Sequence, residues 1–407
     1  MLKRFLRNCE GGAALMASLA MVPLVGSVGA AVDLSRATSL RSNMQAALDA
    51  SAIAMAKDAR NVAAAQLSEN ANNYFKANFQ NAELGNLRTE VAASSTPGGY
   101  SVSMSASGSV KTKFMGILGF SSIDVSVRAT AVSLMDGLGC VLSLNPNASG
   151  AINGPGSTSV TLNGCSLYDN SNHATALTVG GQAQITALSV GVVGNLSGAS
   201  NITTTNGIRT GIGPVADPYA EDSFPAFGGC TENNLIAHGT ITIEPGVYCG
   251  GMIVNGGANL TLNPGIYYID GGKLSINGGA SVTGNGVTLV FTSKNRNGYA
   301  TSTISGGAIV NLTPPKLGPT AGIVMFGDRG MPVGADFKLE GGASQYLGGA
   351  IYLPNAAVGF AGGSGTSASC TQLIGNTVTF TGNSKFLLDC SYSGTKPFSA
   401  VVVRLSS

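Results

Sequence analysis

Charged side chains that could do chemistry, most of them acidic, gather in two stretches rich in turn-forming residues. The candidates are Asp217, Glu221 and Asp222 in the first stretch and Asp328, Arg329, Asp336 and Glu340 in the second. Carboxylates grouped with an Arg or Lys on one exposed face serve as general acid and base in polysaccharide-degrading enzymes. Single acids scattered in loops are more often solvated. We therefore predict that the chain is not an enzyme and has no catalytic residue.

The sequence offers little to hold a metal ion or a cofactor. Its two histidines are His173 and His238, which we interpret as polar surface or corner residues. The acids between Asp217 and Asp222 could bind a cation such as calcium, but no D-x-D-x-D-G loop contains them. H-E-x-x-H, C-x-x-C, G-x-S-x-G and P-loop motifs are missing too. No cofactor and no metal site are predicted.

The cysteines have a spacing that suits disulfide bonds. Six of the seven, all except Cys9, form three pairs separated by 25, 19 and 20 residues. The pairs are Cys140 with Cys165, Cys230 with Cys249, and Cys370 with Cys390. Neighbouring β-strands lie about 4.8 Å apart, and the Cα atoms of a disulfide lie about 4.4 to 6.8 Å apart. We predict three bridges between stacked coils of the chain in an oxidising compartment, with buried free thiols as the alternative.

Those coils are indicated by an internal repeat in residues 241–291. Glu244-Pro-Gly-Val-Tyr aligns with Asn263-Pro-Gly-Ile-Tyr at an offset of 19, and Asn255-Gly-Gly-Ala aligns with Asn277-Gly-Gly-Ala at an offset of 22. Short alternating strands with Gly or Asn corners, repeated about every 20 residues, are typical of a β-solenoid, in which each coil buries its inward side chains on its neighbours. We predict a Gly- and Asn-rich parallel β-helix over residues 137–407.

Three stretches interrupt this pattern. Residues 211–230 contain three prolines, three acids and two phenylalanines, so we predict that they leave the coil as an inserted loop or wrap along its side. Residues 292–303 and 326–338 are predicted loops as well. The last strand-like segment, FSAVVVRL, is predicted to form a terminal coil or cap.

The composition excludes a strongly charged partner. Charged residues make up 10% of the chain, there are 58 glycines, and the net charge is +2. No electrostatic field favours nucleic acid, so we predict no nucleic-acid partner.

Residues 11–32 are apolar enough to span a membrane. They form an uncharged run of 22 residues, or about 33 Å of helix. The basic residues Lys3, Arg4 and Arg7 precede the run, so the positive-inside rule predicts a cytoplasmic tail at residues 1–10 and export of the remainder. The alternative is a cleaved secretory signal peptide, because residues 27–31 are small enough for a cleavage site.

Residues 33–136 are predicted to form an α+β domain. Apolar residues recur at steps of three and four from Leu40 to Val62, which is typical of an amphipathic helix. We expect this helix to continue from the span to about Leu67 and on toward Phe79, with its stripe packed on its own domain or, alternatively, on another subunit. Residues 87–134 alternate as strands around a short helix at KTKFMGILGF. A long helix on a small antiparallel sheet is pilin-like in shape.

The N-terminus resembles that of the TadE/TadG-like proteins of Flp (Tad) pilus assembly. The resemblance covers about the first 60 residues and rests on the basic start, Glu10-Gly-Gly-Ala-Ala, the apolar segment and the polar residues after that segment, in this order. The motif positions are Pro23, Asp33, Arg36, Arg41, Gln45 and Asp49. The Gly-rich remainder, including Cys140 and Pro245-Gly-Val-Tyr-Cys-Gly-Gly, is similar to the long extracytoplasmic part of TadG-like members.

The resemblance implies a membrane-anchored pilus assembly protein. Prepilin processing normally needs a Glu five residues after the cut, but Met16 and Ala17 follow Gly11 and Gly12 at that spacing, so pilin-like cleavage is not expected. The implied protein is single-pass in the bacterial inner membrane, with its bulk periplasmic or extracellular. Its implied partners are other Tad proteins, with the cell wall or glycans as further candidates. An adhesive or carbohydrate-binding β-helix and a polysaccharide-degrading enzyme are the alternatives.

The expected fold is therefore mainly β with an N-terminal α part. A single transmembrane helix leads into a pilin-like α+β domain, and the parallel β-helix comes after it.

Overall fold

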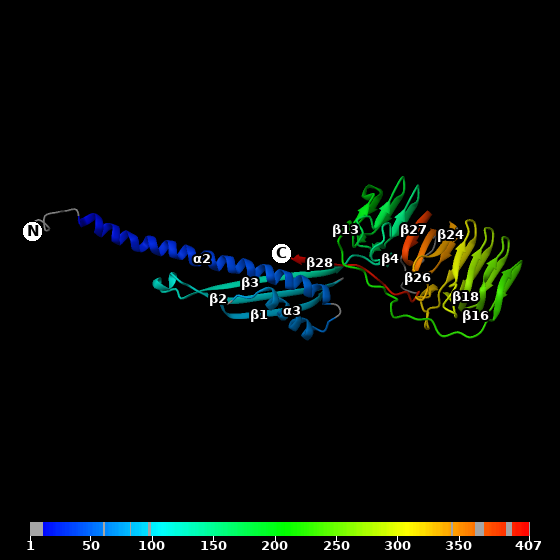
Figure 1. Cartoon of the computed structure of the whole chain (residues 1–407), viewed down its shortest axis with the longest axis horizontal. Helices are drawn as coiled ribbons and strands as arrows, with labels where there is room; N and C mark the ends of the chain where they lie inside the picture. Colours follow the sequence, from blue (N-terminus) through cyan, green and yellow to red (C-terminus); the bar gives the residue numbers. More distant parts are fainter. Residues whose placement is uncertain are drawn as a thin grey trace, which may run out of the picture. The chain divides into compact units, whose positions relative to one another are not determined.

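The chain divides into two compact units. The computed structural model describes residues 11–59, 62–81, 83–96, 99–342, 345–362, 370–387 and 393–406. Unit 1 comprises Met1–Leu134 with Val402–Ser407, and unit 2 comprises Met135–Val401 (Figure 1). The predicted cytoplasmic tail, residues 1–10, lies outside the described residues.

Two helices form the α part of unit 1. Helix α2 spans Gly11–Asp58 and helix α3 spans Ala64–Asn78. The single helix expected to run on toward Phe79 is thus divided in two. The backbone of Ala63 is extended (φ −61°, ψ 146°), which stops the helical path and allows α3 to pack beside α2.

A four-stranded sheet completes unit 1. Its strands are β1 (Leu84–Thr96), β2 (Gly99–Lys111), β3 (Ser122–Met135) and β28 (Val401–Ser406), in the order β1-β2-β3-β28. β2 pairs antiparallel with both β1 and β3. A short 3₁₀ helix, η1 (Met115–Leu118), lies between β2 and β3, where the sequence predicts a short helix.

Alternation along the strands builds the core of unit 1. Val102, Met104 and Ala106 of β2 are buried while the residues between them are partly exposed. They pack on the buried stripe of α2, which includes Met44 and Leu48. Helix α3 contributes Leu67, Ala71 and Phe75 to the same core. Each fully buried large side chain in such a core contributes about 1.5–3 kcal/mol.

The described residues of unit 2 form strands and one short 3₁₀ helix, η2 (Ala199–Asn201). The first strands along the chain are β4 (Gly139–Ser143), β5 (Ile152–Gly154), β6 (Ser159–Asn163), β7 (Ser166–Asp169), β8 (Leu177–Val179), β9 (Gln184–Ala187), β10 (Val190–Val192), β11 (Leu196–Ser197), β12 (Ile202–Thr204) and β13 (Ile208–Thr210). The later strands are β14 (Glu232–Ala237), β15 (Thr240–Ile243), β16 (Gly246–Val254), β17 (Asn259–Leu262), β18 (Gly265–Ile276), β19 (Ser281–Asn285), β20 (Val287–Thr292), β21 (Thr301–Ile304), β22 (Ile309–Thr313), β23 (Ile323–Gly327), β24 (Ala335–Gly342), β25 (Gln345–Leu347), β26 (Gly349–Gly362) and β27 (Thr371–Leu387).

Strands of unit 2 pair in parallel with strands that lie one coil later in the chain. We call one such coil a circuit. Thr240 of β15 aligns with Asn259 of β17, an offset of 19. Val254 of β16 aligns with Ile276 of β18, an offset of 22. Both offsets found in the sequence repeat are therefore true strand registers, and circuits of unequal length explain why the repeat varies.

The strands form two stacks that meet in the middle of unit 2. The first stack runs from β4 to β13 and the second from β14 to β27. β27, near the end of the chain, pairs in parallel with β4, β5 and β6. β13 and β14 consequently lie at opposite ends of the combined stack, and residues 211–230, which we name the strap, connect them (Figure 1).

The strap wraps along the side of the stack, one of the two routes expected for these residues. Its Val215 and Tyr219 are buried, and its Phe227 ring stacks on Tyr268 with ring centroids 4.7 Å apart. Phe398, from the returning C-terminal segment, packs in the same apolar cluster. This cluster lies outside the main core, so the central sheet is buried on both faces, as expected for parallel strands.

The expectation of a terminal coil or cap at the C-terminus is wrong. Strand β28 leaves unit 2 and joins the unit 1 sheet at the edge of β3. β2 occupies one side of β3 and leaves the other side with unpaired backbone groups, which an alternating strand can satisfy. The chain therefore passes between the units twice, and within unit 2 the backbone N–H of Asp136 donates to the carbonyl of Ala400 (3.0 Å).

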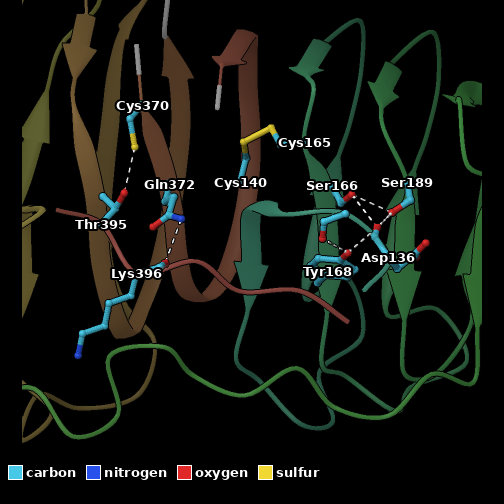
Figure 2. Close-up of a disulfide and its surroundings, with 11 residues drawn as sticks. Asp136, Cys140, Cys165, Ser166, Tyr168, Ser189, Cys370, Gln372, Thr395 and Lys396 are labelled. Atoms are coloured by element: carbon cyan, nitrogen blue, oxygen red, sulfur yellow. Dashed lines mark hydrogen bonds between the residues drawn. A yellow bond between two sulfur atoms is a disulfide. The ribbon is translucent and has the colours of Figure 1, made fainter. Parts of the chain in front are cut away.

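Two of the three predicted disulfides are present. Cys140 is bonded to Cys165 (Cα atoms 5.7 Å apart), and Cys230 is bonded to Cys249 (5.6 Å). Cys370 is disulfide-bonded, and its predicted partner Cys390 lies outside the described residues. Figure 2 shows the first bridge beside the entry into unit 2.

A polar cluster holds that entry in place. The backbone carbonyl of Asp136 accepts hydrogen bonds from the hydroxyls of Ser189 (2.7 Å), Tyr168 (2.9 Å) and Ser166 (3.2 Å) (Figure 2). Arg209 forms an ion pair with the Asp136 carboxylate. These buried bonds fix the first residues of unit 2 to three successive circuits.

Candidate interaction site on the N-terminal helix

The first half of α2 exposes an apolar surface. Leu19, Met21 and Leu24 are each at least 64% exposed, and Val25 and Val28 are similarly open. Among the described residues, one helix is long and apolar enough to cross a membrane, by its length and composition. Apolar side chains exposed around a helix are favourable in lipid and costly in water.

Asp33, the first charged residue after this apolar surface, has a fully satisfied carboxylate. It accepts hydrogen bonds from the backbone N–H groups of Met115 (2.8 Å), Phe114 (2.9 Å) and Lys113 (3.0 Å). The Arg36 guanidinium lies 3.4 Å away. The Met115 N–H and then the other N–H donors hold the pKa of Asp33 below its usual value despite burial. The carboxylate thereby fixes the β2–β3 loop to the helix.

Arg36 connects Asp33 to Glu83, the residue directly before β1. Its second nitrogen donates to Glu83, 2.8 Å away. This hydrogen bond and the charge of Arg36 lower the pKa of Glu83. The carboxylates of Asp33 and Glu83 therefore remain ionised at neutral pH.

An open polar groove follows one turn further along α2. It has a volume of about 560 Å³ and is lined by Thr38, Arg41, Ser42, Gln45, Ala46 and Asp49. The Gln45 amide donates to Asp49 (2.7 Å) and to the backbone carbonyl of Arg128 in β3 (2.9 Å). The groove thus presents one guanidinium and one carboxylate, positioned by an amide, on a rigid helix. Such a surface can recognise a polar segment of another protein.

Of the six motif positions, Pro23 alone lies in the apolar part of the helix. Pro23 cannot donate a backbone hydrogen bond, and its carbonyl accepts one from the Ser27 hydroxyl (2.7 Å). The other five gather in two groups, the Asp33 and Arg36 ion pairs and the Arg41, Gln45 and Asp49 groove. All six therefore lie on one helix, and its bounds are Gly11–Asp58.

Residues 11–58 match the Tad family, described as "Putative Flp pilus-assembly TadE/G-like". The match therefore spans the same residues as α2, and we call α2 the TadE/G-like helix. No curated protein and no solved structure matches the chain. The match supports a role in Flp pilus assembly and bears on the helix alone.

Beyond the TadE/G-like helix, Asp217 and Asp222, two of the acids considered for catalysis, bind the strap to the rest of unit 2. Asp217 accepts a hydrogen bond from the Tyr352 hydroxyl (2.7 Å), and Asp222 is paired with Lys396 (2.5 Å). Arg329 donates to the backbone carbonyls of Asp222 (2.6 Å) and Tyr219. These groups come from the strap, the stack and the C-terminal return, so they tie three distant segments together.

The remaining acids do not converge. Asp328 accepts a hydrogen bond from Thr292 (2.6 Å). Asp336 pairs with Lys338 at 3.7 Å, and both side chains are more than half exposed. Within the described residues, no group of three or more His, Cys, Asp or Glu side chains could hold a metal ion. The geometry therefore gives these acids partners in the structure and no shared site.

Sequence reasoning missed the groups that hold Asp33. Lys113, Phe114 and Met115 follow it by about 80 residues, and they act through backbone N–H groups that carry no side-chain signal. The only available sign was an apolar insertion, FMGILGF, between two alternating strands.

Proposed function

We propose that the chain is a non-enzymatic, membrane-anchored component of Flp (Tad) pilus assembly. The family match carries this proposal, because it coincides with a helix whose N-terminal half exposes apolar side chains and whose C-terminal half belongs to a folded unit. The helix is thus both an anchor and a structural element. Unit 1, with a long helix on an antiparallel sheet, is the pilin-like domain of this protein.

Unit 2 is, in this proposal, a β-solenoid that serves as a scaffold or docking surface. Parallel pairing between successive circuits and a continuous interior core support the assignment. The strap and its fastenings make the stack rigid without forming a catalytic centre. Rigid, weakly charged surfaces of this kind suit permanent contacts with other proteins.

The proposed location follows from charge and redox chemistry. Lys3, Arg4 and Arg7 favour a cytoplasmic N-terminus. The disulfides of unit 2 form in an oxidising compartment, which supports a periplasmic or extracellular location for unit 2. Because Met16 and Ala17 stand where a processing Glu is normally found, the span is retained and the protein stays in the inner membrane.

Deletion and complementation test this function. In a piliated host, removal of the gene should abolish or strongly reduce pili, and the wild-type gene should restore them.

Arg41→Ala and Asp49→Ala, which alter the groove, should complement poorly at normal protein levels. Lys57→Ala is the matched control, since Lys57 is an exposed cation on the same helix outside the groove. Unchanged pili after deletion would refute the proposal.

A further inference from the structure

The loop between β2 and β3 carries an exposed apolar tip. We define the tip as residues 114–120, which include η1. Four of its side chains are largely open: Phe114 is 46% exposed, Ile117 86%, Leu118 55% and Phe120 60%. Four large apolar side chains open within seven residues form a patch that soluble surfaces rarely leave uncovered.

The tip lies against the apolar part of α2. An added Cβ atom at Gly29 would lie 2.6 Å from Cβ of Phe114, and one at Gly26 would lie 3.8 Å from Leu118. Glycine at position 29 therefore permits the close approach. Gly29 and Gly26 precede Asp33 by four and seven residues, or about 6 and 10 Å along a helix.

Hydrogen bonds at both ends of the tip hold it beside Gly26 and Gly29 of α2. The Asp33 carboxylate binds the backbone N–H groups at the start of η1. At the other side of the loop, the Thr112 hydroxyl donates to the carbonyl of Phe120 (2.5 Å), and the Thr112 N–H donates to Ser121 (3.2 Å). The apolar side chains are thus presented outward by a fixed backbone.

We propose that the tip inserts into the membrane at the point where α2 emerges from it. This inference rests on the proposed membrane anchor. The exposed side chains of Leu24, Val25 and Val28 lie at the same height along α2 as the tip. The patch therefore continues the surface that lipid covers. A depth of about 6–10 Å matches the boundary between headgroups and acyl chains, where apolar faces of peripheral elements bind.

The charges around the tip agree with a lipid partner. Lys111 and Lys113, exposed just before it, lie where lipid phosphates would be, and the tip itself has no charged residue. Asp33 and Arg36, at the same boundary, are paired and hydrogen-bonded. The tip would thus give unit 1 a second membrane contact and restrict its tilt about the anchor.

Tryptophan fluorescence can test this insertion, because the chain contains no tryptophan. Three single substitutions in the full chain serve as reporters: Ile117→Trp in the tip, Leu24→Trp in the span and Ile53→Trp on the same helix. Ile53 is 40% exposed and follows Asp33 by 20 residues, or about 30 Å. Each variant is reconstituted in phosphatidylcholine and phosphatidylglycerol vesicles with plain or brominated acyl chains.

We expect Ile117→Trp and Leu24→Trp to lose most of their emission in brominated vesicles and Ile53→Trp to keep it. Emission of Ile117→Trp as insensitive to bromine as that of Ile53→Trp, with Leu24→Trp quenched, would overturn tip insertion and leave the anchor intact. An unquenched Leu24→Trp would instead overturn the anchor, and the proposed function with it. Quenching of all three reporters would contradict the depth assigned to the tip.

Discussion

The hydroxyl of Tyr352 donates a hydrogen bond of 2.7 Å to the carboxylate of Asp217, which precedes it by 135 residues. The same hydroxyl accepts a hydrogen bond from Arg329 (2.7 Å). One buried phenol thus joins the strap to the stack and positions the guanidinium that binds two strap carbonyls. Burial, and then Asp217, raises the pKa of Tyr352, so the hydroxyl stays protonated and remains a donor.

Tyr352→Phe should loosen the strap. It removes one hydroxyl and leaves Asp217 and Arg329 each short of a partner, which costs about 1–3 kcal/mol. Chemical unfolding monitored by near-UV circular dichroism should show a lower midpoint, and proteases should cut residues 211–230 faster. Asp336→Asn is the control, since its ion pair is exposed and should change stability by no more than about 0.5 kcal/mol. Equal behaviour of the two variants would contradict the role of the network.

Asp169 should make the stability of unit 2 depend on pH. It is fully buried, one of its carboxylate oxygens has no hydrogen-bond partner among the described residues, and burial raises its pKa to about 7. The unfolded chain releases this proton near pH 4. Between about pH 4 and 7 the folded state therefore binds the extra proton, and stability falls as pH rises, by up to about 4 kcal/mol.

Asp169→Asn should remove this dependence. The variant should be more stable than the wild type at pH 8 and lose that advantage at pH 5. Unfolding midpoints measured across this range would show it, with Asp336→Asn again as the control. A wild-type midpoint that does not fall between pH 5 and 8 relative to Asp169→Asn would rule out a raised pKa at this position.

The cysteines should be almost fully oxidised. Of seven cysteines, six belong to the three predicted pairs, so thiol titration in denaturant without reductant should find one free thiol, that of Cys9. The double substitution Cys140→Ala with Cys165→Ala should lower the stability of unit 2 by about 2–4 kcal/mol, because the unfolded chain loses a constraint. Three or more free thiols would exclude the predicted set of bridges.

Asp33→Asn should release the β2–β3 loop. The neutral amide presents one acceptor oxygen in place of two and weakens all three N–H bonds. Hydrogen exchange at the amides of Lys113, Phe114 and Met115 should accelerate, whereas Glu83→Gln, which alters only the outer ion pair, should leave it slow.

In the wild type, the pKa of Asp33 is lowered, so protection of these amides should persist above pH 4 and be lost as pH falls below the usual range of Asp.

Local features were predictable from the sequence because they depend on neighbours. Alternation between residues 87 and 134 predicted strands, and cysteines one circuit apart predicted the bridges at Cys165 and Cys249. The uncharged run from Gly11 to Val32 indicated a membrane-spanning helix because apolar side chains such as Leu19, Leu24 and Val28 are favourable in lipid, and these three are exposed in the structure. The TadE/G-like residues were likewise found from their order along one segment.

The long-range connections were not predictable in this way. An alternating segment such as 401–406 fits any open sheet edge, and only the complete set of edges decides that it joins β3. The acids of the strap look solvated because the side chains that pair with them, Tyr352 with Asp217 and Lys396 with Asp222, lie more than 100 residues away. The break between α2 and α3 contains no proline or glycine, so propensity gives no sign of it.

The two strands that join the stacks, β4 and β27, are synthesised at different times. The Ser143 hydroxyl donates to the carbonyl of Asn376 across 233 residues of chain (2.9 Å), so β4 leaves the ribosome long before β27. At 5–20 residues per second this delay is roughly 10–50 s. For that interval the first stack ends in a bare strand edge, which could pair with another nascent chain. A chain shortened before residue 371 would never close that edge, so the last quarter of the sequence protects the second quarter from aggregation.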